Sequence, residues 1–298
     1  KVFFCNSGAE ANEAAIKFAR IYGGPGRFEI ITMKDSFHGR TLATVAATGQ
    51  DKIKDGFEPL PLGFKHVPFN DVKAVKDALT DKTTAIMLEP IQGEGGINIA
   101  SKDYIASLRQ LCNEKNLLLI FDEVQTGMGR TGEMFCYQHY GITPDIMTLA
   151  KSLGGGVPIG AMTVKADIAH SLKPGSHAST FGGSPLVCRA ALAVFKAIEK
   201  DKLLNNVNFI SKYLFDRLNK LKGQYPVIKE IRGRGLMIGI ELHRECKSLT
   251  AECLKRGLLI NCTQGNVLRL MPPLIVAKKD VNKALGILDE GLKSLPKE

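Results

Sequence analysis

Short apolar runs alternate with amphipathic segments along the first two thirds of the chain. The runs have the length and composition of buried parallel strands, and they cover residues 28–33, 84–89, 117–121 and 146–149. Between them, residues 71–79 and 104–116 repeat apolar positions at helical spacing. This alternation predicts an α/β domain with a mostly parallel sheet. Residues 50–70 hold several prolines and are expected to form an irregular loop.

The C-terminal part of the chain has a different pattern. From Pro185 a long helical apolar face extends past residue 214, and we expect Asn205 and Asn206 to interrupt it. Strand-like and helical segments then alternate over residues 236–242, 249–256, 258–260, 267–270 and 281–295. We therefore predict a large domain over residues 1–200 and a smaller α+β domain over residues 201–298.

The composition is that of an ordinary soluble globular protein, with 44% hydrophobic and 23% charged residues. The net charge of +10 suits a cleft for anionic substrates, and no basic tract interleaved with aromatic residues favours nucleic-acid binding. The seven cysteines are scattered without a Cys-x-x-Cys pair, so we expect neither a metal site nor a redox motif, and a cytoplasmic location is the simplest. No apolar run is long enough for a membrane span, and no signal peptide is recognisable.

The start of the chain combines a strand with a capped helix. Residues 1–4 are strand-like, and Ser7 with Glu10 three positions later forms a capping box. Free amides at such a helix start bind anions, and Gly8 lets a ligand approach closely. A plain capped helix without a ligand has the same local sequence.

Reactive side chains follow two of the predicted strands. Asp122 and Glu123 come directly after residues 117–121, and Lys151 follows residues 146–149. Open α/β sheets place their ligands beyond the carboxyl ends of the strands, so the acid and the lysine should face one crevice. This pair suits a cofactor that needs a carboxylate at one end and an amine at the other.

These motifs together resemble those of the class III aminotransferases, which carry pyridoxal phosphate (PLP). The resemblance rests on Asp-Glu-Val-Gln-Thr-Gly at residues 122–127 and Ala-Lys-Ser-Leu-Gly-Gly-Gly at residues 150–156, and it runs along the whole chain. It is closest to the acetylornithine and ornithine branch, and it implies the PLP-dependent transferase fold of type I. Because family members have a segment before residue 1, we expect an N-terminal part to be missing here.

The resemblance assigns contacts with PLP to two loops. Ser7, Gly8 and Ala9 would bind the phosphate at the helix start. Phe37 would stack on the ring with its flat face, and His38 would lie beside it as a hydrogen-bonding residue without a catalytic role.

Asp122 and Lys151 would carry the chemistry. Asp122 would sit against the pyridine nitrogen, where a carboxylate favours the protonated ring that withdraws electrons from the substrate. Val124 would pack under the ring, and Gln125 would hydrogen-bond its oxygen. Lys151 would hold PLP through its amine and, once displaced by substrate, would move the substrate proton as a base.

Two arginines are expected to bind substrate carboxylates. Arg40 offers a planar pair of donors matched to a carboxylate. Arg269, in Arg-Leu-Met-Pro-Pro-Leu at residues 269–274, matches the second carboxylate-binding arginine of the family. Glu94, in the family's motif at residues 89–96, matches the glutamate that pairs with this arginine.

The loop at residues 175–185 contains Ser179 and Thr180. Family members place these hydroxyls on the PLP phosphate of a neighbouring subunit, which implies a homodimer with shared active sites. A loop whose hydroxyls only stabilise turns is the alternative.

The expected reaction is transfer of the amino group of N2-acetylornithine to 2-oxoglutarate in arginine biosynthesis. Ornithine, succinylornithine and 4-aminobutyrate are alternative donors. A catalytically silent binding protein of the same fold is a second hypothesis, against which Lys151 and Asp122 argue. A basic nucleic-acid binder is the third.

Overall fold

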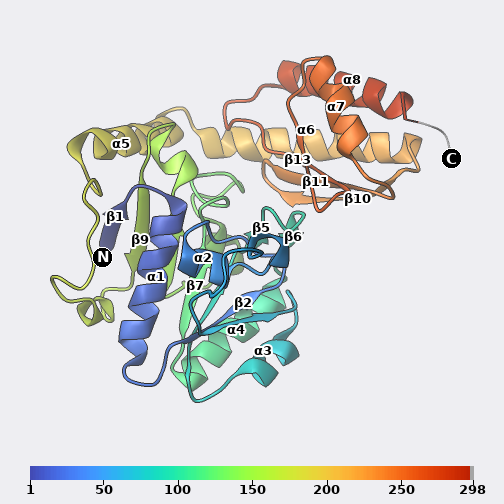
Figure 1. The fold of residues 1–298 in the computed structure, drawn as a ribbon. Coiled ribbons are helices and arrows are strands. Elements are labelled where there is room, and N and C mark those ends of the chain that lie inside the picture. The colour runs from blue at the N-terminus through green and yellow to red at the C-terminus, as the bar shows by residue number, and fades with distance from the viewer. Residues whose placement is uncertain (296–298) are drawn as a thin grey trace. The chain divides into compact units, whose positions relative to one another are not determined.

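The computed structural model describes residues 1–295 (Figure 1). It divides into two compact units. Unit 1 comprises Lys1–Gly93, Ile99–Met128 and Phe135–Lys196, and unit 2 comprises the remaining described residues. Residues 296–298 belong to the predicted small domain and lie outside the described part of the chain.

Unit 1 is built on a sheet with the strand order β1-β9-β8-β7-β4-β2-β3. These strands are β1 (Val2–Cys5), β2 (Glu29–Met33), β3 (Phe64–Val67), β4 (Thr83–Leu88), β7 (Leu118–Asp122), β8 (Ile146–Leu149) and β9 (Gly160–Val164). The neighbours from β8 to β3 pair in parallel, whereas β9 is antiparallel to both β8 and β1. The prediction of a mostly parallel sheet is confirmed.

The central strands are covered on both faces, which explains their continuous apolar sequences. Successive side chains of a strand point to opposite faces. In β7, Ile120 packs in one cluster with α1 (Gly8–Gly23), whereas Leu119 and Phe121 pack in another with α4 (Lys102–Lys115). Helices therefore cover both faces of the sheet (Figure 1), and most positions of such a strand are apolar.

Shorter elements complete the first two thirds of the chain. They are α2 (Leu42–Ala47), η1 (Asp51–Ile53), α3 (Val72–Ala78), β5 (Ile91–Gln92), β6 (Asn98–Ile99), η2 (Cys136–Tyr140), η3 (Lys151–Gly154) and η4 (Ala169–Ser171). The expectation of an irregular loop over residues 50–70 was wrong in one respect, because this stretch contains β3. A four-residue edge strand with one buried side chain, Val67, leaves too weak a pattern to recognise.

Unit 2 contains an antiparallel sheet with the order β10-β11-β13-β12. Its strands are β10 (Ile228–Arg234), β11 (Met237–Leu242), β12 (Asn261–Thr263) and β13 (Val267–Leu270). The helices α6 (Leu203–Gln224), α7 (Lys247–Lys255) and α8 (Lys278–Lys293) share one apolar cluster with this sheet. The predicted small α+β fold is therefore confirmed.

Three local features of this region differ from the expectation. The strand-like segment expected at residues 258–260 is not a strand, because β12 begins only at Asn261. The long helix breaks between α5 (Pro185–Lys200) and α6, where Lys202 has a left-handed φ of 52°, and it continues through Asn205 and Asn206. Asn206 lies inside α6 because its amide donates to the carbonyl oxygens of Leu274 and Val276 instead of competing for the helix backbone. Strand β10 was not foreseen, since its lysine, glutamate and arginine residues interrupt the apolar pattern.

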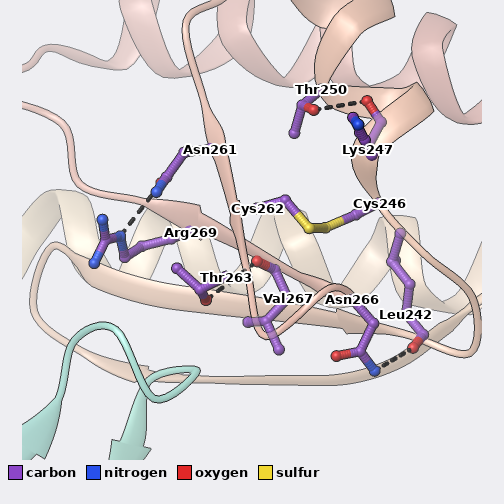
Figure 2. Close-up of a disulfide and its surroundings, with 10 residues drawn as sticks. All are labelled: Leu242, Cys246, Lys247, Thr250, Asn261, Cys262, Thr263, Asn266, Val267 and Arg269. Atoms are coloured by element: carbon purple, nitrogen blue, oxygen red, sulfur yellow. Dashed lines mark hydrogen bonds between the residues drawn. A yellow bond between two sulfur atoms is a disulfide. The ribbon is translucent and has the colours of Figure 1, made fainter. Parts of the chain in front are cut away.

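A disulfide joins two cysteines of unit 2 (Figure 2). Cys246 precedes α7 and Cys262 lies in β12, so the bond connects this helix to the edge strand of the small sheet. The other cysteines are free thiols. The sequence did not indicate this pairing, because it depends on how the chain returns to the sheet after α7.

Among residues 1–295, no helix has the length and apolar character that crossing a membrane requires. Within the same residues no group of His, Cys, Asp and Glu side chains is arranged to hold a metal ion.

Candidate active site

A cavity of about 550 Å³ lies at the carboxyl ends of the parallel strands of unit 1. It brings together most of the residues that the sequence singled out as cofactor or substrate contacts in this unit. These are Ser7, Gly8, Ala9, Phe37, His38, Arg40, Asp122, Val124, Gln125 and Lys151. Residues far apart in the sequence thus line one space.

The start of α1 forms one wall of the cavity. The hydroxyl of Ser7 accepts a hydrogen bond from the amide of Glu10 at 3.2 Å, as expected of a cap, and the Glu10 carboxylate accepts one from the amide of Asn6. Within the described residues, the amides of Gly8 and Ala9 have no intramolecular acceptor. Two free amides at a helix start that lines a cavity are suited to bind an anion.

Gly8 keeps this wall open. A Cβ atom at Gly8 would lie 2.8 Å from Cγ1 of Val124, closer than two carbon atoms can approach. Without that atom, the backbone of α1 can lie directly against Val124. A larger residue at this position would have to displace Val124, which lines the cavity.

Asp122 is a buried carboxylate at the end of β7. Its Oδ2 atom lies 2.8 Å from Nδ1 of His38, and its Oδ1 atom accepts a hydrogen bond from the amide of Val124 at 3.1 Å. Because a carboxylate only accepts, His38 carries its proton on Nδ1. The position of His38 is that of a hydrogen-bonding residue.

Lys151 follows β8 and starts a short 3₁₀ turn with a left-handed φ of 41°. For a residue with a side chain this backbone conformation costs on the order of 1–3 kcal/mol and is often found at functional sites. Asp122 in β7 is the register partner of Thr148 in β8, so the acid and the lysine come from the ends of adjacent strands. Both side chains line the cavity.

The loop of Phe37 is held by a second buried acid, Glu89. Its carboxylate accepts hydrogen bonds from the amides of Phe37 and Gly93, at 3.0 and 3.2 Å. Burial raises the pKa of Glu89 to about 7. Glu89 is therefore a buried acid that holds this loop, and it is not exposed to solvent.

Arg40 and Gln125 lie at other parts of the same cavity. The guanidinium of Arg40 is exposed and lies 5.6 Å from the ring centre of Phe37. The side chain of Gln125 occupies the place that a Cβ atom on Gly93 would take, within 2.4 Å. Gly93 thus gives Gln125 the space to line the cavity.

The remaining predicted substrate contacts lie in unit 2. Nη1 of Arg269 donates to Oε1 of Glu94 at 2.6 Å, and Nε of Arg269 lies 3.3 Å from Oδ1 of Asn261 (Figure 2). The predicted pair is thus in contact; the side chain of Arg269 is 13% exposed and that of Glu94 is 34% exposed. Their roles toward a substrate remain predictions.

Ser179 and Thr180 do not line the cavity. The hydroxyl of Ser179 accepts a hydrogen bond from the side-chain amide of Asn6, a residue that does line it. Thr180 is exposed. A contact of these hydroxyls with another subunit remains a prediction.

A family model described as aminotransferase class-III matches residues 1–292 of the chain. The chain belongs to the class III aminotransferases. It is therefore an aminotransferase, and small-molecule amino and keto acids are its substrates.

Within this family, the chain is similar in sequence to acetylornithine aminotransferases. It is 55% identical to the acetylornithine aminotransferase of Methanocaldococcus jannaschii, over 100% of this chain and 76% of that protein. It is 54% identical to the acetylornithine aminotransferase of Caldanaerobacter subterraneus subsp. tengcongensis, over 99% of this chain and 76% of that protein.

A solved structure of an ornithine aminotransferase from Toxoplasma gondii, with PLP partially occupying its active site, matches with a TM-score of 0.93. The match covers 98% of this chain and 72% of that one, at 36% identity. The predicted fold, type I of the PLP-dependent transferases, is confirmed.

Several side chains around the cavity of the aminotransferase were not found from the sequence. Asn12 lies in α1 and lines the cavity, and Thr148 in β8 contacts it. The sequence did contain one sign that Asn12 is buried. Asn12 lies one helical turn before Ala15 and Ile16, which are buried, so it is a polar residue on the apolar face of α1. Such a residue is buried only if its polar atoms find partners.

Proposed function

We propose that this class III aminotransferase uses PLP to transfer the amino group of N2-acetylornithine to 2-oxoglutarate, a step of arginine biosynthesis. The observation that carries the proposal is the identity of 54–55% to acetylornithine aminotransferases along nearly the whole chain. The cavity supports it, because its residues match the two ends of the cofactor.

The cavity fits PLP at three points. The free amides of Gly8 and Ala9 suit its phosphate. The buried carboxylate of Asp122 suits a protonated ring nitrogen, and the flat face of Phe37 suits the ring itself. Bound PLP supplies an electron-withdrawing ring that stabilises negative charge on a substrate carbon.

Four residues that line the cavity have separate roles in the proposed reaction. Lys151 would hold the cofactor through its amine and, as a base, would move the proton of the substrate carbon. Asp122 holds a proton on the ring nitrogen through its carboxylate. Val124 and Gln125 also line the cavity, where Val124 would pack against the ring and Gln125 would donate to its oxygen.

Two arginines bind the substrate carboxylates in this proposal. Arg40 at the cavity presents a planar pair of donors. Arg269 takes part only when Glu94 releases it, so that Glu94 controls which substrate carboxylate is bound. The Arg269–Glu94 contact of 2.6 Å supports this switch.

We further propose a homodimer with shared sites, to which Ser179 and Thr180 of one subunit contribute. Large apolar side chains near this loop are exposed, as an interface between subunits requires; they include Phe181 at 73% and Leu186 at 76%. The proposed location is the cytoplasm, and fractionation of cells tests it.

A panel of amino donors with 2-oxoglutarate tests the proposed reaction. We expect kcat/KM to be highest for N2-acetylornithine, ahead of ornithine, succinylornithine and 4-aminobutyrate. Lys151→Ala is the matched control and should lose at least about 10³-fold in rate. A higher kcat/KM for ornithine would replace the proposed donor. No turnover of any donor would favour the catalytically silent protein.

A further inference from the structure

Asn12 is a buried amide inside the apolar face of α1. Burying an amide costs free energy unless its polar atoms are hydrogen-bonded. Nδ2 of Asn12 donates to Oδ2 of Asp122 and to the carbonyl oxygen of His38, both at 2.7 Å. Oδ1 of Asn12 accepts from the hydroxyl of Thr148, also at 2.7 Å. Each polar atom of the side chain is thus used.

The chemistry of these partners determines the orientation of the Asn12 amide. A backbone carbonyl oxygen and a carboxylate can only accept, so the NH₂ group must face Asp122 and His38. The amide oxygen then faces Thr148, whose hydroxyl has a proton to donate. A flipped amide would set its oxygen against two acceptors, the Asp122 carboxylate and the His38 carbonyl, and would lose both of those hydrogen bonds.

Three elements of unit 1 meet at this amide. Asn12 comes from α1, Asp122 from β7 and Thr148 from β8, and the last two are register partners in the sheet. Because Asn12 also donates to the backbone carbonyl of His38, it supports the residue that makes the second hydrogen bond to Oδ2 of Asp122. The Asn12 side chain therefore acts on the Asp122 carboxylate both directly and through His38.

Among residues 1–295, the hydrogen bonds to the Asp122 carboxylate leave one of its acceptor positions open. A carboxylate offers about four acceptor positions. Oδ2 is used by Asn12 and His38, and Oδ1 is used once, by the amide of Val124. The remaining position belongs to Oδ1 of a residue that lines the cavity.

We propose that Asn12, supported by Thr148, is a positioning residue that aims Oδ1 of Asp122 at the ring nitrogen of PLP. The inference rests on the proposed function, since it assigns to Asn12 the orientation of the acid that PLP requires. Without the Asn12 amide, the carboxylate can rotate about its Cα–Cβ and Cβ–Cγ bonds, and its hydrogen bond to the ring nitrogen weakens.

The test compares Asn12→Ala with the wild-type enzyme, both loaded with PLP that carries ¹⁵N in the ring. The ¹⁵N chemical shift reports whether the ring nitrogen is protonated, independently of any donor substrate. We expect a protonated nitrogen in the wild type and a shift toward the unprotonated value in Asn12→Ala. We also expect kcat to fall roughly tenfold to hundredfold, with a nearly unchanged KM for the keto-acid acceptor.

Thr84→Val is the matched control. Thr84 is also fully buried, and its hydroxyl donates to the carbonyl oxygen of Ala19 in the same helix, away from Asp122. This variant loses a buried hydrogen bond to α1, so it should lower the melting temperature without changing the ¹⁵N shift or kcat. Asn12→Ala behaving in the same way would overturn the inference.

Thr148→Val keeps the inference testable if Asn12→Ala does not fold. It removes the hydroxyl that orients the amide, and we expect a smaller change of the ¹⁵N shift in the same direction. An unchanged shift would overturn the inference. A wild-type enzyme that binds no PLP would instead overturn the proposed function, so the two failures are distinguishable.

Discussion

Glu89, Glu123 and His66 show how burial controls charge at the scale of single residues. Burial raises the pKa of Glu89 and of Glu123 to about 7, although backbone amides donate to both carboxylates. Burial, aided by the positive charge of Lys54, lowers the pKa of His66 to about 4. In each case the low dielectric disfavours the charged form.

His66 gives a prediction for the pH dependence of stability. Its Nε2 atom lies 3.0 Å from the ammonium of Lys54, and Nδ1 lies 2.7 Å from the hydroxyl of Thr32. The unfolded chain binds a proton at His66 near pH 6.5, whereas the folded chain does so only near pH 4, so His66 by itself lowers the free energy of unfolding as the pH drops between these values, opposite in sign to the contributions of Glu89 and Glu123. Urea unfolding should therefore show that the free energy of unfolding of the wild type falls relative to that of His66→Gln between pH 6.5 and pH 4.

The exposed His170 provides the control for this measurement. His170→Gln should follow the wild-type pH dependence. An NMR titration that places the pKa of His66 near its ordinary value of 6.5 would contradict the prediction.

Arg269 gives a second prediction at this scale. Because a planar guanidinium binds a carboxylate through two hydrogen bonds, Arg269→Ala should raise the KM for the acceptor, 2-oxoglutarate, roughly tenfold to hundredfold. Arg256→Ala, which removes an exposed ion pair with Glu252 in the same unit, should leave this KM unchanged. Equal KM values for all three enzymes would exclude Arg269 from substrate binding.

At the scale of elements, the edge strand β12 is held from two sides. It pairs with β13, which carries Arg269, and Cys262 ties it to the start of α7 (Figure 2). A three-residue strand has few ladder hydrogen bonds of its own. The disulfide therefore helps to hold β12 in place, because the few hydrogen bonds to β13 hold this edge strand only weakly.

Reduction of the disulfide should destabilise the protein. The two cysteines are 16 residues apart, and a loop of this length corresponds to about 3 kcal/mol in the chain-entropy model. Urea unfolding with and without reductant should show this difference for the wild type. The double variant Cys246→Ser, Cys262→Ser should not respond to reductant.

Thiol counting checks that the bond forms in solution. Five thiols should react in the unfolded protein without reductant, and seven should react with it. Seven reactive thiols in both samples would contradict the disulfide.

At the scale of the whole molecule, each unit has its own core. The apolar cluster of unit 2 joins its small sheet to α6, α7 and α8, whereas unit 1 has separate clusters on the two faces of its sheet. The cavity belongs to unit 1, and the Arg269–Glu94 pair belongs to unit 2. The proposed function therefore draws on residues of both units.

Mixing two inactive variants tests the proposed shared site. Lys151→Ala removes the base, and the double variant Ser179→Ala, Thr180→Ala removes the hydroxyls expected to come from the neighbouring subunit. If sites are shared, a mixed dimer has one intact site, so random mixing should restore about a quarter of wild-type activity. Rates are measured after co-refolding the two proteins. No activity above that of the separate variants would contradict a shared site.

The sequence by itself determined the features that depend on neighbouring residues. Apolar runs predicted the central strands, Ser7 with Glu10 predicted the start of α1, and the order of the motifs indicated the family. These signals are local because strand and helix periods repeat within a few residues. They were sufficient to place the acid and the lysine at the ends of two strands on one edge of the sheet.

Only the tertiary structure decided the contacts between distant segments. Asn12 and Thr148 are 136 positions apart, and nothing near either residue indicates their hydrogen bond. The burial of Glu89, the strand β10 and the Cys246–Cys262 bond depend in the same way on packing between elements. Burial and partner choice are properties of the folded chain, because they follow from which surfaces exclude water together.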